Sequence, residues 1–450
     1  MVEYRDPEYL SDEDHPTDRV RCPIHGFIRY SANERAVIDS RYFRRLRHIR
    51  QLGLTEYAYP GANHTRFEHS LGVMEMATAM FDSLAAKKGE MIEEELAQLP
   101  WYVVNTLAKA RQVVRLAALL HDTGHAPFSH AAEKVFHKEG HETLSVKIVL
   151  DPSMLGTLID ETWGGGTATQ VASLLKTDKA GSDLPPQLLF LKSIISGEID
   201  ADRTDYLLRD SYHCGVEYGR FDHRRLIECL TLRKVPGGGL EVAISRDGIH
   251  TVEALIMARF QMNAQVYFHR IRRIYDYFLI EYHKALVEAK AVPSEDVLDL
   301  NDVVMMNLMF SDAKSEEEGP RKFFASRIVD RRHPKIVHET GDDADIKSLR
   351  EAQRIANALI NKYTDVYIVL DDMGGKPITI HKIYVDGDQS NEAVELVVFG
   401  KDGTEKQVGE ESRILSRIPK SFMCVRIFAD ADSEEHRLEI EAYVAELRMR

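Results

Sequence analysis

The sequence predicts a mainly α-helical protein with a smaller α+β lobe at its C-terminal end. Two observations predict this fold class. Apolar residues recur at helical spacing in long segments between residues 34 and 289. From about residue 365 the pattern changes to short, alternating apolar segments that are typical of strands. We therefore expect an N-terminal arm over 1–20, a helical core over 21–324 and an α+β lobe over 325–450 with a regulatory or oligomerisation role.

The composition is that of a globular protein. Hydrophobic residues make up 44% and charged residues 29% of the 450-residue chain. The net charge of −14 argues against general nucleic-acid binding, although a local basic pocket could still hold a polyanion. The first residues do not resemble a signal peptide, and no apolar run approaches the roughly 18 residues of a membrane span. We expect a cytoplasmic protein without a membrane partner.

The first predicted helix, over 34–52, has a basic face. A short strand or turn over 23–28 precedes it. Apolar residues recur along one side of the helix, and its other side carries Arg41, Arg44, Arg45, Arg47 and Arg50. Arginine clusters suit phosphate groups. The helix alone nevertheless favours a solvated basic face.

A second helix is predicted to begin after Thr65 and to continue through Leu84. Thr65 and Glu68 have the spacing of a capping box, which marks the start of a helix. Arg66 and His69 then lie three residues apart on the first turn. Arg66 is placed to bind an anion and His69 to bind a metal, but a surface arginine and a core histidine are alternatives.

A third predicted helix, over 101–120, ends on a run of titratable residues. His121 and Asp122 follow its apolar segment directly, and His125 and His130 come soon after. Burying so many polar groups is costly unless something compensates them, and a divalent cation is the simplest compensation. A solvated helix end is the alternative. A further helix is expected over 129–136.

The third informative segment spans residues 197–210. On a helix, Asp202 and Tyr206 share a face with Arg209, while Arg203 and Asp210 flank it. Neighbouring leucines indicate partial burial, and buried carboxylates need partners. This segment therefore also favours a cation.

The remaining segments complete the predicted architecture. We expect a strand over 240–244, a long helical stretch over 250–289 and a mobile loop over 311–321. Four strands should follow, over 366–370, 378–380, 394–399 and 423–428. An amphipathic helix over 434–447 should end the chain.

Two histidines and two carboxylates on three separate elements could form one mononuclear metal site. Their order along the chain, His69, His121–Asp122 and Asp202, resembles the HD superfamily of metal-dependent phosphohydrolases. The sequence around these residues resembles one subfamily, the deoxynucleoside triphosphate triphosphohydrolases. This subfamily includes the animal SAM-and-HD-domain enzymes and bacterial dGTPases. The similar motifs span 51–53, 59–62, 64–72, 119–130 and 200–206. The resemblance covers about residues 20–285 and does not include a SAM domain.

The resemblance implies a role for each matching residue. The metal would be held by His69, His121, Asp122 and Asp202. The reaction site would be lined by His125, His130, Glu133 and His141. The substrate would be bound by Gln51, Arg66, Arg203, Tyr206, Asp210, Arg259, Asn263 and Tyr267, with Tyr267 beside the ribose 2′ position. An activating nucleotide would be bound between subunits by Asp39, Arg44, Arg47, Asp222, Arg225, Arg246 and Arg270.

The resemblance also implies the reaction. One divalent ion per site (Mn, Fe, Zn, Ni, Co or Mg) would activate water for attack at the α-phosphate of a dNTP. The products would be deoxynucleoside and inorganic triphosphate. Activation by GTP or a dNTP, with Mg accompanying the bound nucleotides, would require a homodimer or a dimer of dimers. Asn263 stands where the animal enzyme has histidine, and Glu133 where it has aspartate.

Two other functions are compatible with the same residues. One is an HD-type phosphodiesterase or single-strand nuclease that uses the same metal. The other is a non-catalytic nucleotide sensor, although binding alone would not require His125, Glu133 and His141.

Overall fold

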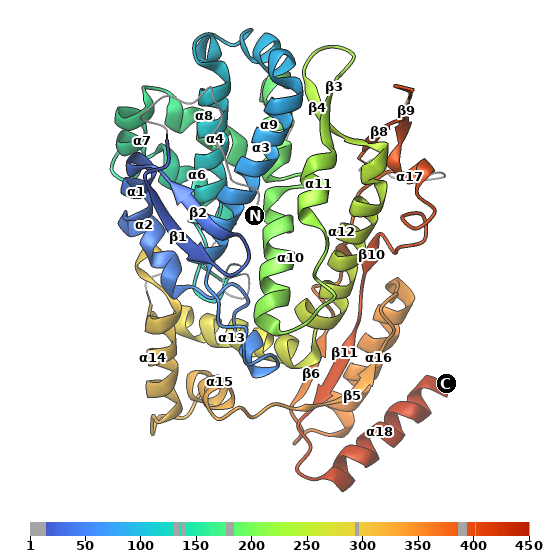
Figure 1. Ribbon diagram of the computed structural model, residues 1–450. Coiled ribbons are helices and arrows are strands. Elements are labelled where there is room, and N and C mark those ends of the chain that lie inside the picture. Colours follow the sequence, from blue (N-terminus) through green and yellow to red (C-terminus); the bar gives the residue numbers. More distant parts are fainter. Residues whose placement is uncertain are drawn as a thin grey trace.

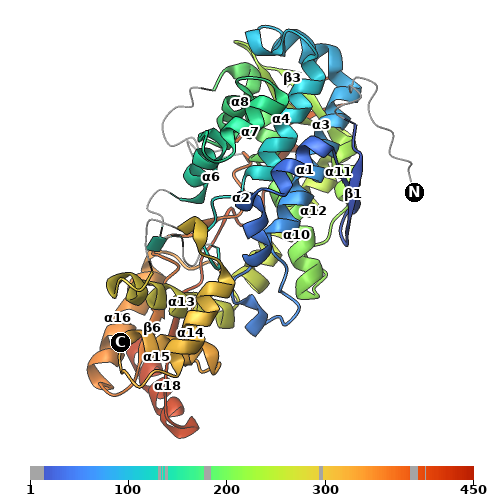
Figure 2. The ribbon, with the colours of Figure 1, turned by 90° about the vertical axis from the view of Figure 1, so that its left-hand side faces the viewer.

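The computed structural model describes residues 15–129, 133, 135–136, 140–176, 184–292, 297–385, 394–400 and 402–449. Helices account for 57% and strands for 12% of the described residues. A helical body occupies one end of the elongated molecule, and a smaller lobe that contains a sheet occupies the other (Figures 1 and 2). The mainly α fold class predicted from the sequence is confirmed.

Three helices form the centre of the helical body. α3 (Arg66–Leu96) packs along α4 (Thr106–Leu120), and α10 (Ala201–Cys214) packs against α3. The expected helix over 101–120 is divided, because the short helix η3 (Pro100–Tyr102) precedes α4. His69 lies on α3 and Asp202 on α10, while His121 and Asp122 directly follow α4.

The start of α3 agrees with the sequence, but its end does not. The capping box is confirmed, because Glu68 Oε1 accepts a hydrogen bond from the Thr65 amide at 3.0 Å. The helix continues twelve residues beyond Leu84, to Leu96. It kinks at Lys88, and buried Ile92 then continues its apolar face.

The chain ahead of α3 forms a hairpin and a series of short helices. β1 (Asp18–Cys22) pairs antiparallel with β2 (Gly26–Tyr30). The single helix expected over 34–52 is wrong; the chain instead forms α1 (Ala32–Ile38), α2 (Arg41–Arg44) and η1 (Arg45–His48). One reason is Ser40, whose hydroxyl accepts from the Phe43 amide at 3.3 Å and starts a new helix. Another is Arg45, which is buried and donates to the carbonyls of Thr123 and His125.

Further short elements surround the central helices. They are η2 (Thr55–Tyr57), α6 (His141–Leu150), α7 (Gly156–Trp163), α8 (Thr167–Leu175), η4 (Pro186–Leu188), α9 (Leu189–Ile195), α11 (His223–Cys229), β3 (Leu230–Lys234), β4 (Leu240–Ser245) and η5 (Arg246–Gly248). The strand expected over 240–244 is confirmed as β4. The helix expected over 129–136 lies largely outside the described residues.

The long helical stretch expected over 250–289 is interrupted. α12 (Ile249–Met262) passes into a π-helical turn, η6 (Asn263–Tyr267), and α13 (Arg270–Glu288) begins after it. The side chain of His269 starts α13 by accepting a hydrogen bond from the Ile271 amide. Such π-helical turns often occur at functional sites.

The loop expected over 311–321 is shorter than predicted and spans residues 314–319. After η7 (Val297–Asp299), α14 (Asp302–Ala313) and α15 (Pro320–Val329) leave only six residues between them. Asp312 on α14 joins this helix to α13 and α15. Its carboxylate accepts hydrogen bonds from Tyr282 at 2.7 Å and from Arg321 at 3.0 and 2.5 Å.

The C-terminal lobe contains an antiparallel sheet covered by helices. The strand order is β5 (Lys335–Glu339), β11 (Arg426–Ala429) and β6 (Ile368–Asp371). Buried residues of α16 (Ile346–Lys362) and α18 (Glu434–Met449) pack against this sheet. The helix expected over 434–447 is confirmed as α18.

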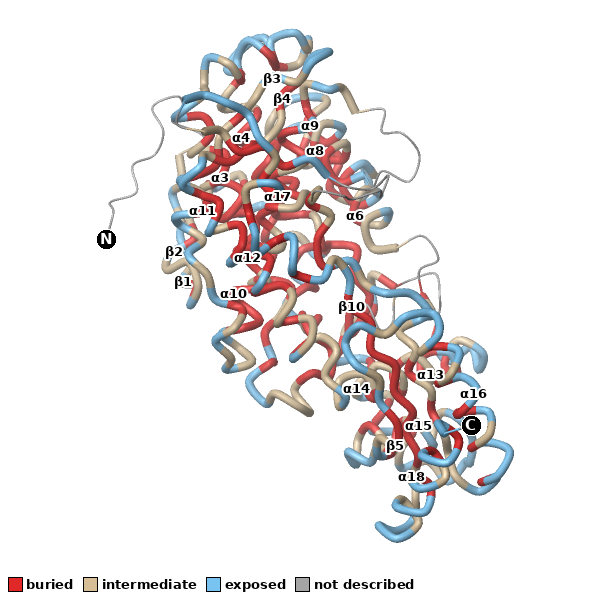
Figure 3. The backbone as a smooth tube through the Cα atoms, turned by 90° about the vertical axis from the view of Figure 1, so that its right-hand side faces the viewer, coloured by how far each residue is buried: buried red, intermediate tan, exposed pale blue. Residues whose placement is uncertain are grey.

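Part of the C-terminal region returns to the helical body. β8 (Val397–Phe399) extends the β3–β4 hairpin by pairing parallel with β4, and β9 (Glu405–Gln407) pairs with β8. Nearby lie β7 (Ile378–Thr379), α17 (Val408–Glu411) and β10 (Ser421–Phe422). Buried backbone runs continuously from the helical body into the lobe (Figure 3). The domain boundary near residue 325 stays a prediction. Among the described helices, none combines the length and the apolar character required to cross a bilayer.

Candidate active site

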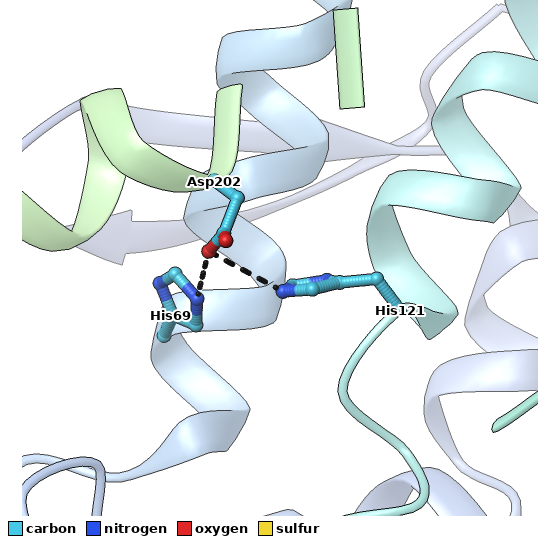
Figure 4. A group of neighbouring side chains, drawn as sticks. All are labelled: His69, His121 and Asp202. Atoms are coloured by element: carbon cyan, nitrogen blue, oxygen red, sulfur yellow. Dashed lines mark hydrogen bonds and ion pairs between the residues drawn. The ribbon is translucent and has the colours of Figure 1, made fainter. Parts of the chain in front are cut away.

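Three helices bring His69, His121 and Asp202 to one point (Figure 4). His69 lies on the first turn of α3, His121 ends α4 and Asp202 lies on the first turn of α10. The His69 Nε2 to Asp202 Oδ1 distance is 3.1 Å, and the His121 Nε2 to Asp202 Oδ1 distance is 3.6 Å. Donor atoms from three elements therefore converge.

Asp122 completes this cluster from the side of α4. Its Oδ1 lies 3.3 Å from His121 Nε2 and 3.2 Å from His125 Nε2. Its Oδ2 contacts Arg66 Nη1 and lies 3.7 Å from His69 Nε2. Asp122 thus lies within contact distance of both histidines predicted to hold a metal, and Arg66 contacts it on one side.

The charges around the cluster stabilise a cation. Burial by itself lowers the pKa of His69, but hydrogen bonds to Asp202 and Asp205 outweigh burial and raise it to about 10. Burial raises the pKa of Asp202, yet the neighbouring His121 and His69 side chains hold it well below its ordinary value. Positive charge is therefore favoured where these side chains meet.

The ring nitrogens of both histidines are suited to a metal. His121 Nδ1 donates to the Ala118 carbonyl at 2.7 Å, and His69 Nδ1 donates to Asp205 Oδ2 at 2.8 Å. This leaves Nε2 of each ring facing the cluster. His121 Nε2 is buried and has no hydrogen-bond partner among the described residues. Two imidazoles and two carboxylates fit a divalent ion.

A second group of side chains lies beside Asp122. The rings of His125 and His141 stack with centroids 3.7 Å apart. Glu133 Oε1 contacts His141 Nδ1 and accepts a hydrogen bond from the His141 amide at 2.8 Å. Burial, together with the charges of Arg66 and His141, holds the pKa of His125 well below its ordinary value. His130, the fourth predicted catalytic residue, lies outside the described residues.

A cavity of about 790 Å³ opens next to the cluster. Its walls include seven of the eight residues predicted to bind substrate: Gln51, Arg66, Tyr206, Asp210, Arg259, Asn263 and Tyr267. The eighth, Arg203, is not among the described lining residues, and its Nη1 donates to Asp200 Oδ2 at 2.5 Å. Arg66 connects cavity and cluster, since it lines the first and contacts Asp122 in the second.

Asp210 is held in the cavity wall by two partners. Tyr267 donates its hydroxyl to Asp210 Oδ2 at 2.7 Å, and His64 Nε2 lies 2.7 Å from Asp210 Oδ1. The His64 ring stacks on His213 with centroids 4.4 Å apart. Gln51 Oε1 is buried and has no hydrogen-bond partner among the described residues. The wall thus offers fixed acceptors for a polar ligand.

Sequence reasoning missed several residues at this site. His64 lies in the motif over 64–72, but the sequence predicted no role for it. The far wall of the cavity comes from α13 and from residues near 370–379, where Arg273 pairs with Asp371 at 3.0 and 2.5 Å. No local pattern could predict a pair 98 residues apart. Phe128 and Ser129 adopt left-handed backbone (φ 55° and 59°), and Ser129 Oγ accepts from Arg66 Nε at 2.8 Å.

The residues predicted to bind an activating nucleotide lie on the exposed surface, apart from the cavity. Asp39, Arg44 and Arg47 belong to the α1–η1 segment, and Arg47 lies over the Phe67 ring at 3.5 Å. Asp222 and Arg225 share the first turn of α11, which contacts the short helix that contains Arg246. Arg270 is the first residue of α13. These surfaces belong to separate parts of the molecule, and their role stays a prediction.

Comparisons with known proteins agree with this geometry. Residues 66–153 match the HD domain, and residues 221–365 match the HD associated region. YwfO of Bacillus subtilis, an uncharacterised protein, is 36% identical over 276 residues, which cover 61% of this chain and 56% of YwfO. The deoxynucleoside triphosphate triphosphohydrolase SAMHD1 homolog of Dictyostelium discoideum is 27% identical over 386 residues, 81% of this chain and 64% of that protein. Human SAMHD1 is 29% identical over 284 residues, 57% of this chain and 42% of its own length.

The chain spans about half the length of most of the curated relatives it matches. Among solved structures, it resembles the crystal structure of a hypothetical protein from Aquifex aeolicus, with 26% identity and a TM-score of 0.72. That similarity covers 94% of this chain and 99% of the other.

Proposed function

The chain belongs to the HD-domain family of metal-dependent hydrolases, and from this premise we propose that it is a deoxynucleoside triphosphate triphosphohydrolase. The observation that supports this most is the junction between the His/Asp cluster and the cavity. Arg66 contributes to both, so a triphosphate bound by Arg66 would lie beside the cluster while its nucleoside occupies the cavity. The reaction would release deoxynucleoside and inorganic triphosphate by water attack at the α-phosphorus.

One group of residues would hold a metal, and a second group would supply a proton donor. A divalent ion held by His69, His121, Asp122 and Asp202 would activate water and neutralise charge on the α-phosphate. Arg66 would exchange its contact with Asp122 for the phosphate oxygens. We propose that Arg203 leaves Asp200 to do the same.

His125 is the proposed proton donor to the departing 5′-oxygen. Its pKa is low in the free protein because of burial and because the Arg66 and His141 charges lie near it. Phosphate oxygens would offset the Arg66 charge and raise this pKa, so that substrate binding would protonate the ring. His141, which contacts Glu133 and stacks on His125, would hold the ring in place.

Recognition of the deoxyribose is proposed for the wall that contains Asp210. The Asp210 carboxylate and Gln51 Oε1, which has no hydrogen-bond partner within the described part of the chain, are suitable acceptors for a sugar hydroxyl. Tyr267 donates to Asp210, so its ring is fixed beside the same position and could exclude a 2′-hydroxyl by shape. Arg259 and Asn263 would contact the base.

Nucleotide activation is a further part of the proposal. GTP or a dNTP would bind at the surface residues of α1, α11 and the start of α13, and a dimer or dimer of dimers would form around it. Size-exclusion chromatography with light scattering, with and without GTP plus a dNTP, tests this. An unchanged mass together with activity that is independent of the second nucleotide would contradict it.

The decisive experiment identifies the products. Purified protein is incubated with each dNTP and Mn²⁺ or Mg²⁺, with and without GTP, and chromatography measures deoxynucleoside and triphosphate. We expect both products in equal amounts, and none with His121→Ala. Cleavage of short oligonucleotides in place of dNTPs would favour a nuclease. Nucleotide binding without any product would favour a sensor.

A further inference from the structure

Asp205 lies behind the His/Asp cluster that is proposed to hold the metal, and it is completely buried. Its carboxylate accepts hydrogen bonds from His69 Nδ1 at 2.8 Å and from His25 Nε2 at 2.6 Å. It also accepts two hydrogen bonds from Arg209, from Nε and from Nη2, each at 2.8 Å. Three donor side chains therefore meet on one carboxylate, and one of them is a metal-binding candidate.

We propose that Asp205 is the positioning residue of the metal centre, and that His25 and Arg209 hold it there. By accepting the Nδ1 proton of His69, Asp205 keeps Nε2 as the atom that faces Asp202 and His121. A carboxylate in this position fixes the orientation of a ligating histidine and makes it a better ligand. The inference rests on the metal site of the proposed function but not on the identity of the substrate.

The surrounding backbone is built to admit this carboxylate. Gly72 lies on α3, one turn after His69, and faces the pair formed by Asp205 and Arg209. A Cβ atom at position 72 would lie 2.0 Å from Asp205 Oδ1 and 2.2 Å from Arg209 Nη2. Any larger residue would displace the pair, so glycine is required at position 72 for this arrangement.

The N-terminal hairpin supplies the second anchor. His25 lies in the turn between β1 and β2, 180 residues from Asp205 in the sequence. Cys22, the last residue of β1, accepts a weak hydrogen bond from Arg209 Nη2 at 3.6 Å. The hairpin lies beside α10 in Figure 1. The hairpin therefore supports the metal centre from behind, in addition to packing on the core.

A purely structural role for the Asp205–Arg209 pair is the competing explanation, and the chain offers a matched control for it. Glu34 on α1 is also buried, and it accepts hydrogen bonds from Arg115 Nε at 2.6 Å and Nη2 at 2.9 Å. This pair joins α1 to α4, and within the described residues none of the hydrogen bonds or ion pairs of Glu34 involves a metal-binding candidate. Removing either carboxylate should destabilise the fold, but only the loss of the Asp205 carboxylate should weaken metal binding.

The test is a calorimetric titration of metal-free protein with Mn²⁺, without nucleotide. We expect Asp205→Asn to weaken Mn²⁺ binding about 10- to 100-fold, because a neutral amide lacks the negative charge that holds the Nδ1 proton of His69 and makes its Nε2 a better ligand. Glu34→Gln should lower the thermal midpoint and leave the Mn²⁺ affinity unchanged. Wild-type affinity in folded Asp205→Asn, or an equal loss in Glu34→Gln, would overturn the proposal.

A second pair of variants decides the matter if Asp205→Asn does not fold. His25→Leu removes one donor to Asp205 and should weaken Mn²⁺ binding several-fold. His25→Gln should restore it, because the glutamine amide nitrogen can donate from about the same position as His25 Nε2. Equal affinities in both variants and the wild type would overturn the proposal. A lack of dNTP turnover would leave this titration interpretable, so the two proposals fail separately.

Discussion

Single residues at this site have their charge states set by neighbours from distant parts of the chain. His69 is a clear case, since two aspartates of α10 reverse the effect of burial on its pKa. His125 is the opposite case, because Arg66 adds to the effect of burial. Two buried histidines near one another in the fold therefore have pKa values shifted in opposite directions. Such a separation is typical of sites that bind a cation and transfer a proton.

His283 provides a test of burial at the residue scale, away from the metal. It is completely buried on α13 against Phe136, both ring nitrogens lack partners among the described residues, and burial lowers its pKa to about 3. Between pH 6.5 and 3 the unfolded chain binds a proton here that the folded protein does not. Stability should therefore fall as the pH falls, by up to about 1.4 kcal/mol per pH unit from this group.

We expect His283→Phe to remove this contribution. Urea unfolding of the variant and the wild type between pH 8 and pH 5 measures the difference. The variant should gain relative stability progressively below about pH 6.5, because phenylalanine fills the same space without a titratable group. Parallel pH profiles would contradict this account of His283.

At the scale of elements, the turn after α4 approaches α6 closely, and this contact sets the position of His141 relative to His125. Gly124 follows the His121–Asp122 pair, and its amide donates to Ser145 Oγ on α6 at 2.9 Å. Ser145 Oγ in turn donates to the His121 carbonyl at 2.7 Å. The turn after α4 is therefore joined directly to the helix that begins with His141.

Gly124→Ala should separate these elements. A Cβ atom at position 124 would lie 2.2 Å from the His141 carbonyl oxygen and 2.7 Å from the Ser145 amide nitrogen, so α6 must move. We expect kcat for dNTP hydrolysis to fall about 100-fold, with Mn²⁺ affinity nearly unchanged. Gly89→Ala is the matched control, because its Cβ would meet only Leu107 at 3.5 Å. Wild-type kcat in Gly124→Ala would show that the position of α6 does not matter for the reaction.

At the scale of the whole molecule, the cavity is completed by the C-terminal region. Arg273 on α13 pairs with Asp371 at the end of β6, and both line the cavity together with residues near 379. The pair connects the helical body to the sheet of the lobe. It also neutralises a carboxylate in the wall of the cavity proposed to hold the nucleoside.

Arg273→Gln should therefore weaken substrate binding more than it affects the reaction. Loss of a charged hydrogen-bonded pair costs about 1.5–3 kcal/mol, so we expect KM for dNTPs to rise about tenfold or more, with kcat changed less than about threefold. Arg321→Gln is the control, because it breaks a similar pair with Asp312 outside the described cavity lining. An equal effect of both variants on KM would indicate general destabilisation.

The sequence by itself determined the features that depend on near neighbours. Helical spacing predicted the fold class, and the Thr65–Glu68 capping box predicted where α3 begins, because these signals act over one or two helical turns. The clustered histidines and aspartates indicated a divalent-metal site and which residues were candidates to hold the metal. Helical spacing gave a wrong prediction where a tertiary contact interrupts the helix. The single helix expected over 34–52 is an example, because buried Arg45 interrupts it.

Only the tertiary structure decided how these residues meet. The contact of His25 with Asp205 spans 180 residues, and the contact of His64 with Asp210 spans 146. The cavity wall near 370–379 likewise comes from a region whose sequence showed only strands. Such contacts depend on how all the helices pack, and no spacing within one segment encodes them.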